Sequence, residues 1–235
     1  DKIHYIDEQG DTKISDEKVR TFVSSSYGVR NHYNYVTCLI SKESKLYCRY
    51  NKSGILNEVK NGTLWKDIIT ANGFIYGIKT DNSLWCWGNN KIADPFDPTK
   101  IYKDIFGTGD TSDFINEPIQ IDISHIGSSI NKIKISTSGT FYLLSNLNKL
   151  YCWGKNYTYN HAGVKLIGTC GTNNTNDEYI KKPTEVYGAH LWENFYLSND
   201  KTCAIRKDKT LWCWGEEGFN FLKIKPLQVK NRINK

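Results

Sequence analysis

The sequence of 235 residues contains no methionine and no long apolar run. A membrane-spanning helix needs about 20 predominantly apolar residues. No stretch of the chain approaches that length, so we expect no transmembrane segment. No signal peptide is visible at the N-terminus. Because the chain starts at Asp1 and lacks methionine, we expect it to be a processed or trimmed product.

Motifs of common catalytic, metal and nucleotide sites are also missing. The five histidines show no i, i+4 pairing, and no Cys-x-x-Cys pair offers zinc ligands. Ser128-Ser129 lacks the glycines of a nucleophile elbow. Five aspartates do not follow a calcium-loop spacing, and we expect them to be solvated loop carboxylates: Asp94, Asp97, Asp104, Asp110 and Asp113. The sequence predicts no catalytic residue, no cofactor and no metal.

The charge is mildly basic, with 31 Lys and Arg against 25 Asp and Glu. Basic residues are interleaved with acidic ones, and the densest basic stretch is the tail from Lys223 to Lys235. This pattern is typical of a solvated surface and predicts no specific nucleic-acid partner. The aromatic share of 13% favours strands, because aromatic side chains suit a half-buried pleated surface.

A ten-residue step occurs four times in the chain. The steps run from Cys38 to Cys48, Tyr76 to Cys86, Tyr142 to Cys152 and Cys203 to Cys213. Each ends in Leu, an aromatic residue and Cys, and three continue with Trp-Gly. A polar run at the centre predicts β-hairpins over residues 36–50, 74–88, 140–154 and 201–215. Their second strands are apolar on both faces, which predicts sheets packed on both sides, as in propeller blades.

The register of the predicted hairpins indicates which cysteines can form disulfides. A central turn places Cys38 opposite Cys48 and Cys203 opposite Cys213, close enough for disulfides. A further bridge, Cys152–Cys170, would tie a strand to the following loop, which leaves Cys86. The alternative is that these thiols are free and buried. Disulfides predict an oxidising location, secreted, periplasmic or at the cell surface.

The order of motifs resembles a known repeat. Aromatic-Cys-Trp-Gly, an Asn-rich turn, Gly107-x-Gly109 and the Pro183-x-x-Val186 pattern are similar to the regulator of chromosome condensation family, over roughly residues 20 to 220. The resemblance implies an all-β propeller with about 50 residues per blade. The form with paired cysteines resembles repeats of secreted or surface bacterial members.

Two departures from the family pattern affect the predicted architecture. Well-known members have about seven blades, and only four hairpins are visible, the first with Arg49-Tyr50 in place of Trp-Gly. A hairpin over Lys2 to Lys13 and a tail strand over Leu222 to Val229 would add terminal strands and close a ring. We expect one domain over residues 1–235 with four to five blades, forming a small ring, a degenerate propeller, or an arc that another chain completes.

The two longest loops, Asn89 to Asp113 and Lys155 to Lys182, carry aromatic residues among polar ones. Rigid scaffolds present recognition loops in this way, and aromatic anchors dominate such contacts. The alternative is that these rings pack against neighbouring blades. The candidate partner-binding residues are Phe96, Tyr102, Phe106, Tyr157, Tyr159 and Tyr179.

The leading interpretation is an extracellular or cell-surface binding or structural module that contacts another protein or copies of itself, and not an enzyme. One alternative, implied by the family's founding member, is an intracellular nucleotide-exchange factor or chromatin binder. Another is a secreted enzyme inhibitor. Four sequons are candidate glycosylation sites in a eukaryotic secretory pathway: Asn51, Asn61, Asn156 and Asn173.

Overall fold

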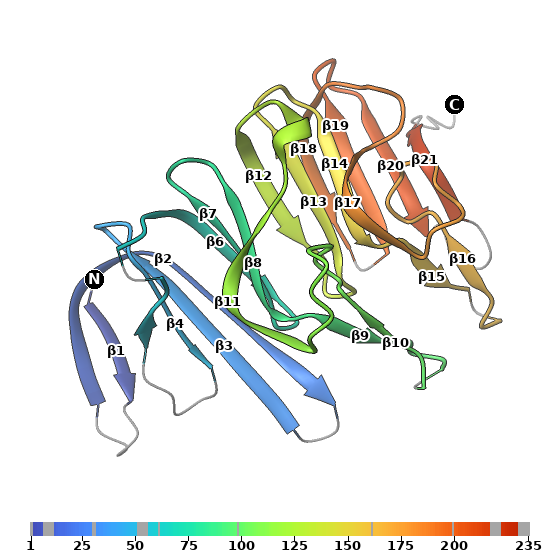
Figure 1. Ribbon diagram of the computed structural model, residues 1–235. Coiled ribbons are helices and arrows are strands. Elements are labelled where there is room, and N and C mark those ends of the chain that lie inside the picture. The colour runs from blue at the N-terminus through green and yellow to red at the C-terminus, as the bar shows by residue number, and fades with distance from the viewer. Residues whose placement is uncertain are drawn as a thin grey trace, which may run out of the picture. The chain divides into compact units, whose positions relative to one another are not determined.

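The computed structural model is built from β-strands (Figure 1). It describes residues 2–6, 12–29, 32–50, 56–60, 62–97, 99–160, 162–198, 200–216 and 222–229. Within these ranges the one helical element is a 3-10 turn, η1 (Ser124–Ile126), and no helix is long and apolar enough to span a membrane. The prediction of an all-β fold is confirmed.

Contacts divide the chain into two compact units. Unit 1 comprises residues 1–91 and 108–123, and unit 2 comprises residues 92–107 and 124–235. Each unit contains two larger antiparallel sheets, of four or five strands, which we call blades 1 to 4 in chain order.

Unit 1 contains blades 1 and 2. Blade 1 has the strand order β1-β2-β3-β4-β5, and blade 2 has the order β11-β8-β7-β6. The strands are β1 (Lys2–Ile6), β2 (Thr12–Val29), β3 (His32–Ser41), β4 (Leu46–Tyr50), β5 (Asn57–Glu58), β6 (Trp65–Ala71), β7 (Phe74–Lys79), β8 (Leu84–Asn89) and β11 (Phe114–Ile121).

Unit 2 contains blades 3 and 4, ordered β12-β13-β14-β17 and β18-β19-β20-β21, and the strand pairs β9/β10 and β15/β16. Strand β9 begins at Lys91, the last residue of the first segment of unit 1, and continues into unit 2. The strands are β9 (Lys91–Ala93), β10 (Ile101–Lys103), β12 (Ile130–Ile135), β13 (Thr140–Ser145), β14 (Leu150–Lys155), β15 (Tyr157–Tyr159), β16 (Lys165–Ile167), β17 (Tyr179–Glu185), β18 (Trp192–Leu197), β19 (Lys201–Arg206), β20 (Leu211–Glu216) and β21 (Leu222–Gln228).

All four predicted hairpins are present, in the predicted register. Cys38 lies opposite Cys48, and Cys203 lies opposite Cys213. In the other two hairpins a tyrosine occupies the first position, so Tyr142 faces Cys152. Each turn contains one residue with left-handed backbone at the same repeat position: Ser44, Asn82, Asn148 and Lys209. A turn followed by a left-handed residue is a common three-residue hairpin loop, and it fixes the register of the strands it joins.

The three predicted disulfides are confirmed. Cys38–Cys48 and Cys203–Cys213 join directly opposed residues, with Cα atoms 4.2 and 4.1 Å apart. Cys152 faces a tyrosine, and it bonds instead to Cys170 in the following loop. Cys86 is buried outside these bridges, and its thiol lies 3.7 Å from the carbonyl oxygen of Ile119.

These bridges predict a thiol count that can be measured. We expect that the protein, unfolded in denaturant without reductant, reacts with one equivalent of iodoacetamide, at Cys86. The folded protein should react far more slowly, because a buried thiol is shielded from the reagent. Peptide mass spectrometry locates the label. Labelling of several cysteines in protein isolated from its source would contradict the bridges.

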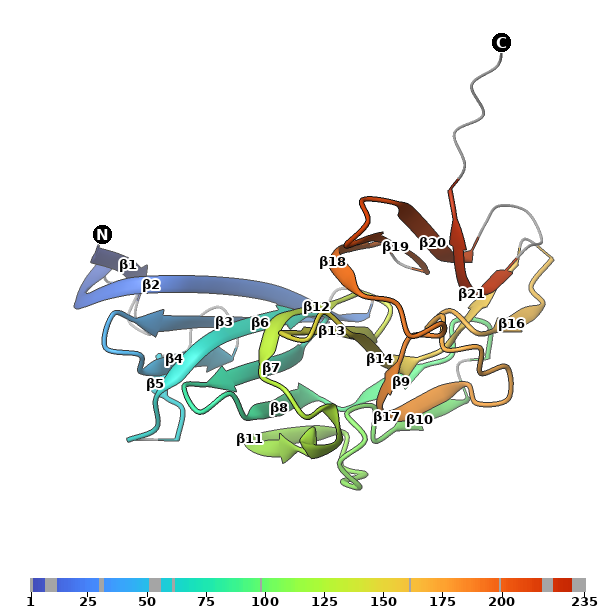
Figure 2. The ribbon, with the colours of Figure 1, turned by 90° about the horizontal axis from the view of Figure 1, so that it is seen from above.

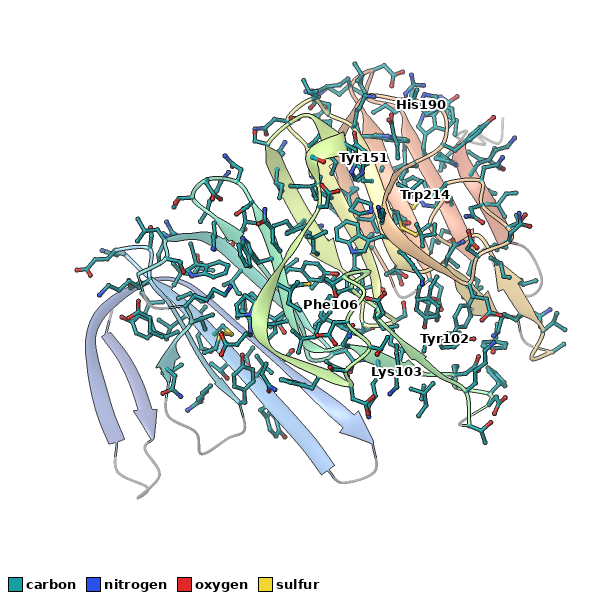
Figure 3. All side chains as sticks on the ribbon, in the orientation of Figure 1. Tyr102, Lys103, Phe106, Tyr151, His190 and Trp214 are labelled. Carbon is teal, nitrogen blue, oxygen red and sulfur yellow. A yellow bond between two sulfur atoms is a disulfide. The ribbon has the colours of Figure 1, made fainter. Side chains whose placement is uncertain are left out.

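The prediction that both sheet faces are covered is confirmed in blade 3, where every residue of β13 and β14 is buried. Tryptophans recur at the contacts between blades within each unit. The indole nitrogen of Trp87 donates to the hydroxyl of Tyr50 at 2.9 Å in unit 1. In unit 2 the indole of Trp214 (Figure 3) donates to the hydroxyl of Tyr142, also at 2.9 Å. Within each unit the two blades are therefore joined by aromatic packing and a hydrogen bond from a tryptophan to a tyrosine.

The glycine of the repeated Trp-Gly pair has a steric cause. Gly88 has a φ of +96°, and a Cβ there would lie 2.3 Å from the carbonyl oxygen of Gly73. That oxygen accepts a hydrogen bond from the amide of Asn89. Gly154 and Gly215 repeat this geometry, with Cβ clashes of 2.4 and 2.2 Å. A side chain cannot fit between the two hairpin strands at this position.

We therefore expect Gly88→Ala to destabilise unit 1 by about 3 kcal/mol or more, because it combines backbone strain with a clash. The matched control is Gly109→Ala in the same unit. Gly109 has a similar φ of +85° with nothing within 4 Å of an added Cβ, so its cost should be about 1 kcal/mol. Equal losses in chemical denaturation would show that the close approach to Gly73 does not matter.

The terminal strands were predicted in part. β1 pairs with β2, as the predicted hairpin over Lys2 to Lys13 requires. The turn that joins these two strands lies outside the described residues. β21 pairs with β20 and completes blade 4. The pairing of the tail with N-terminal strands that ring closure would need is not among the described strand pairs.

Candidate partner-binding site

The two long loops each fold into a short hairpin, and the hairpin tips meet within unit 2. The first tip joins β9 to β10 and carries Phe96, and the second joins β15 to β16. The rings of Phe96 and Tyr159 lie 4.3 Å apart between centroids. A Cβ added to Gly163 would lie 3.7 Å from the Phe96 ring. Segments more than 60 residues apart in sequence thus form one surface, which we call the tip site.

The tip site exposes apolar side chains at its rim. Phe96 is 63% exposed, and Ile101 and Val164 are each at least half exposed. Burial of these side chains against a partner would be favourable, since exposed apolar area gains free energy when it leaves water. The rim therefore resembles the core of a small protein–protein contact.

The six predicted aromatics divide into three groups by exposure. Phe96 is exposed, and Tyr102, Tyr159 and Tyr179 are half-buried beneath the rim. The prediction of direct partner contact is wrong for Phe106 and Tyr157, which are fully buried. Phe106 (Figure 3) packs on Phe141, at 6.3 Å between ring centroids. Both residues instead follow the alternative interpretation, in which the ring packs inside the protein.

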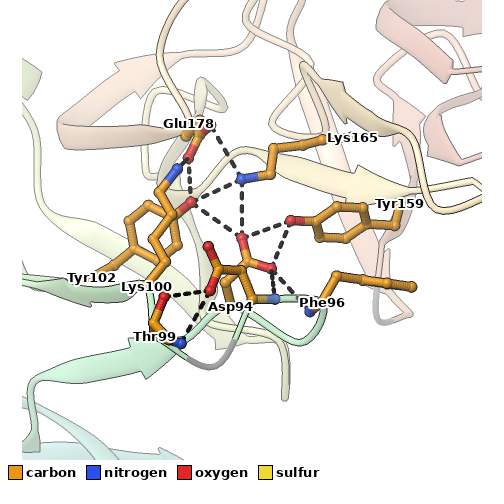
Figure 4. A network of polar contacts seen from close by, with 9 residues as sticks. Asp94, Phe96, Thr99, Lys100, Tyr102, Tyr159, Lys165 and Glu178 are labelled. Carbon is orange, nitrogen blue, oxygen red and sulfur yellow. Dashed lines mark hydrogen bonds and ion pairs between the residues drawn. The ribbon is translucent and has the colours of Figure 1, made fainter.

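A network of charges lies directly under the rim (Figure 4). The buried carboxylate of Asp94 accepts hydrogen bonds from the hydroxyl of Tyr159 at 2.6 Å and from Lys165 Nζ at 3.0 Å. It also accepts from the backbone amide of Phe96 at 3.0 Å, which fixes the first tip. The expectation that Asp94 is solvated is wrong. Its carboxylate is buried, and Tyr159 and Lys165 supply hydrogen bonds in place of water.

Glu178 closes the network from the segment before β17. Its carboxylate lies 3.2 Å from Lys165 Nζ and 3.0 Å from Lys100 Nζ, and it accepts a short hydrogen bond from the hydroxyl of Tyr102. Tyr102 in turn stacks on Tyr179, with ring centroids 4.5 Å apart. Two carboxylates and two ammonium groups thus neutralise one another and hold both tips in place.

The network keeps each group in its ordinary charge state. Burial raises the pKa of Asp94, but hydrogen bonds from Tyr159 and Lys165 outweigh it and hold that pKa well below its usual value. Burial lowers the pKa of Lys165, yet its hydrogen bonds to Tyr102 and Asp94 raise it above the usual value. Burial and the hydrogen bond to Glu178 raise the pKa of Tyr102 to about 12.

These shifts bear on proton exchange at the tip site. A general acid or base works best when its pKa lies near the operating pH. The shifts move Asp94, Lys165 and Tyr102 away from neutrality, so none of these three is poised to exchange a proton there. In the part of the chain that the structure describes, no group of three or more His, Cys, Asp or Glu side chains is placed to hold a metal.

Comparison with known proteins identifies the blade type. No protein-family model and no curated protein matches the sequence. The fold matches human WBSCR16 with a TM-score of 0.62 and 12% identity, over 92% of this chain and 54% of that one. It also matches Prp20p from Saccharomyces cerevisiae with a TM-score of 0.61 and 13% identity, over 95% and 54%. Yeast RCC1 (Prp20) bound to Kap60 gives 0.61 and 12%, over 94% and 51%.

The blades are those of an RCC1-like β-propeller. The predicted resemblance is thereby confirmed at the level of fold, although identities of 12 to 13% carry no function. The chain spans about half the length of these solved structures.

Sequence reasoning missed the ionic part of the tip site. Lys165 is 71 positions from Asp94, and nothing in the spacing connects them. The one available signal was the concentration of aromatic residues in both long loops, which pointed to the correct segments. The partners of Asp94 depend on how the two hairpins fold against each other.

The structure also bears on the sequons. Asn156 is fully buried, and its side-chain amide donates to the carbonyl oxygens of Asn174 and Asp177. A glycan at Asn156 is therefore incompatible with this fold, and that prediction is wrong. Asn173 is exposed and stays a prediction. Asn51 and Asn61 lie outside the described residues.

We expect Lys165→Met to destabilise unit 2 by about 3 kcal/mol, because it leaves the buried carboxylate of Asp94 without its cation. The control is Lys209→Met, which removes an exposed ion pair of 2.6 Å with Glu193 and should cost less than about 1 kcal/mol. Both are measured by chemical denaturation.

The pH dependence follows from the sign of the shift. The pKa of Asp94 is lowered on folding, so its stabilisation is present above the unfolded pKa of about 4 and is lost only in stronger acid. The difference between wild type and Lys165→Met should be constant from about pH 5 to about pH 8. A difference of zero across this whole range would show that Lys165 does not stabilise the ionised carboxylate of Asp94.

Proposed function

We propose that the chain is an extracellular or cell-surface RCC1-like module that binds another protein through the tip site. The supporting observation is an exposed apolar rim on a rigid ionic base. Phe96 projects into solvent, while Asp94 binds the backbone amide of Phe96 and is itself held by Lys165. A preorganised aromatic anchor loses little conformational entropy on binding, which is typical of residues that dominate interfaces.

The proposed location is supported by the cysteines. Six of the seven form disulfides, including two that cross directly between hairpin strands. Such bridges are rare in reducing compartments. They favour a secreted or surface module over an intracellular exchange factor or chromatin binder, although one solved structure of this fold is described with binding to Gsp1p and histones. We retain the proposal that residues 1–235 belong to one propeller domain.

The binding role is tested with Phe96→Ser. Wild type, Phe96→Ser and the control Leu147→Ser are immobilised and exposed to secreted and surface proteins of the source. Leu147 is a similarly exposed apolar residue on a different turn, between β13 and β14. A true partner should bind wild type and Leu147→Ser alike, and Phe96→Ser about tenfold or more weakly.

Thermal unfolding checks that the variants are folded. A partner that binds all three proteins equally would show that the tip site is not the binding surface. Free thiols at the six bridge cysteines, in protein isolated from its source, would contradict the extracellular location.

A further inference from the structure

Blades 2 and 4 each hold a tryptophan ring with the same short turn. In blade 2 the indole nitrogen of Trp85 donates to the hydroxyl of Ser83 at 2.8 Å, and that hydroxyl donates to the carboxylate of Asp81. Figure 2 shows the strands of this blade in the order β6, β7, β8 and β11. The corresponding residues of blade 4 make the same contacts: Asp208, Thr210 and Trp212. The two rings are fixed at equivalent places of the repeat, so their surroundings can be compared.

Two lysine ammonium groups contact the ring of Trp85. The Nζ atom of Lys79, on β7, lies 3.6 Å from the ring centroid, and the Nζ atom of Lys60, in the loop between β5 and β6, lies 4.3 Å from it. All three side chains are half-buried. The electron-rich face of an indole attracts a cation, which holds both ammonium groups near one ring in spite of their mutual repulsion.

No carboxylate among the side chains that the structure describes lies within ion-pair distance of either ammonium group. The carboxylate of Asp81 accepts instead from the amide and the hydroxyl of Ser83, and that of Glu58 accepts from a backbone amide of its own loop. Burial and the charge of Lys60 lower the pKa of Lys79, and Asp81 opposes this only in part. The positive charge at this ring is therefore not compensated by the residues around it.

The equivalent ring in blade 4 is balanced in charge. Arg206, at the repeat position of Lys79, lies 5.1 Å from the ring centroid of Trp212 and pairs with Asp208 at 3.4 Å. The second basic side chain there is His190 (Figure 3), whose ring centroid lies 4.9 Å from that of Trp212. Burial and the charge of Arg206 lower the pKa of His190, so its imidazole is neutral at pH 7. Blade 2 differs by a second permanent cation and by the lack of a paired carboxylate.

We propose that Lys60 and Lys79 bind a tetrahedral oxyanion, a sulfate or phosphate group, beside the ring of Trp85. Such a group accepts charge-assisted hydrogen bonds from both ammonium groups and removes their repulsion. Each ammonium group is carried on a flexible four-carbon stem and can turn from the ring to the anion. The site is complete within unit 1, because Lys60 follows the last strand of blade 1 and Trp87, on the same face of β8 as Trp85, bonds to Tyr50 of blade 1. It uses other residues than the tip site and goes beyond the proposed function.

The indole N–H signals in NMR spectra of the full chain test the proposal, with the Trp85 signal assigned through Trp85→Phe. Sodium sulfate, added in exchange for sodium chloride at constant ionic strength, should shift this signal to saturation, while the Trp212 signal should not respond in this way. Lys60→Gln and Lys79→Gln should each weaken sulfate binding about tenfold or more, because each removes one charge-assisted hydrogen bond. The control Lys181→Gln/Lys182→Gln loses two exposed lysines of unit 2 and should bind sulfate like wild type.

Two further probes distinguish the sources of the oxyanion. Inorganic phosphate that binds like sulfate supports a site for free anions, whereas dextran sulfate that binds far more tightly at the same Trp85 signal, with uncharged dextran inert, supports a polymer that carries the group. The absence of a saturable shift at Trp85, an equal shift at Trp212, or unchanged affinity in both lysine variants would overturn the proposal. Thermal unfolding checks that the variants are folded. Phe96→Ser should bind sulfate like wild type, so the outcome is independent of the tip site.

Discussion

Each four-stranded sheet of this chain has two apolar faces, and both must be removed from water. Blade 3 meets this requirement, since every residue of β13 and β14 is buried. The face that carries Tyr142 is covered by Trp214 and Phe195 of blade 4, and the hydrogen bond from Trp214 to Tyr142 satisfies polar atoms that this contact buries. Stability here comes from pairs of neighbouring blades, because a single sheet cannot bury its own faces.

The same constraint explains the small residues of the repeat. Trp-Gly pairs combine a large side chain that fills the space between blades with a residue that lacks a Cβ. Gly154 shows why, since a Cβ there would lie 2.4 Å from the carbonyl oxygen of Gly139. The bridges Cys38–Cys48 and Cys203–Cys213 act within a blade, where they lock hairpin register, and the tryptophans act between blades.

Local pairing was predictable to a large extent. The ten-residue step placed Cys38 opposite Cys48, and the register of β3 and β4 agrees residue by residue. Tyr142 removes the opposed partner of Cys152, and the sequence then offered a bridge to Cys170 as one option, which the structure contains. Hairpins are local structures whose geometry is set by turn length, so short sequence windows contain the information.

The tip site was predictable only in outline. The long aromatic loops were the correct segments, but Phe106 and Tyr157 turned out to be buried and Asp94 to be ion-paired. The exposure of a loop residue depends on which distant segment folds over it. The local sequence around the residue does not contain that information. The same is true of Asn156, a formally valid sequon whose side chain is fully buried.

The sequence by itself determined the four hairpins, their register and the two bridges within them, because these depend on alternation, turn length and residue spacing along a short stretch of chain. The blade type came from the resemblance of the repeat to a known family. The tertiary structure alone decided that Asp94 meets Lys165, that Phe96 projects while Phe106 does not, and that Leu150 is covered while the equivalent Leu211 is not. Equivalent residues in a repeat have the same neighbours along the strand. They differ in what packs above them, and only the folded chain supplies that neighbour.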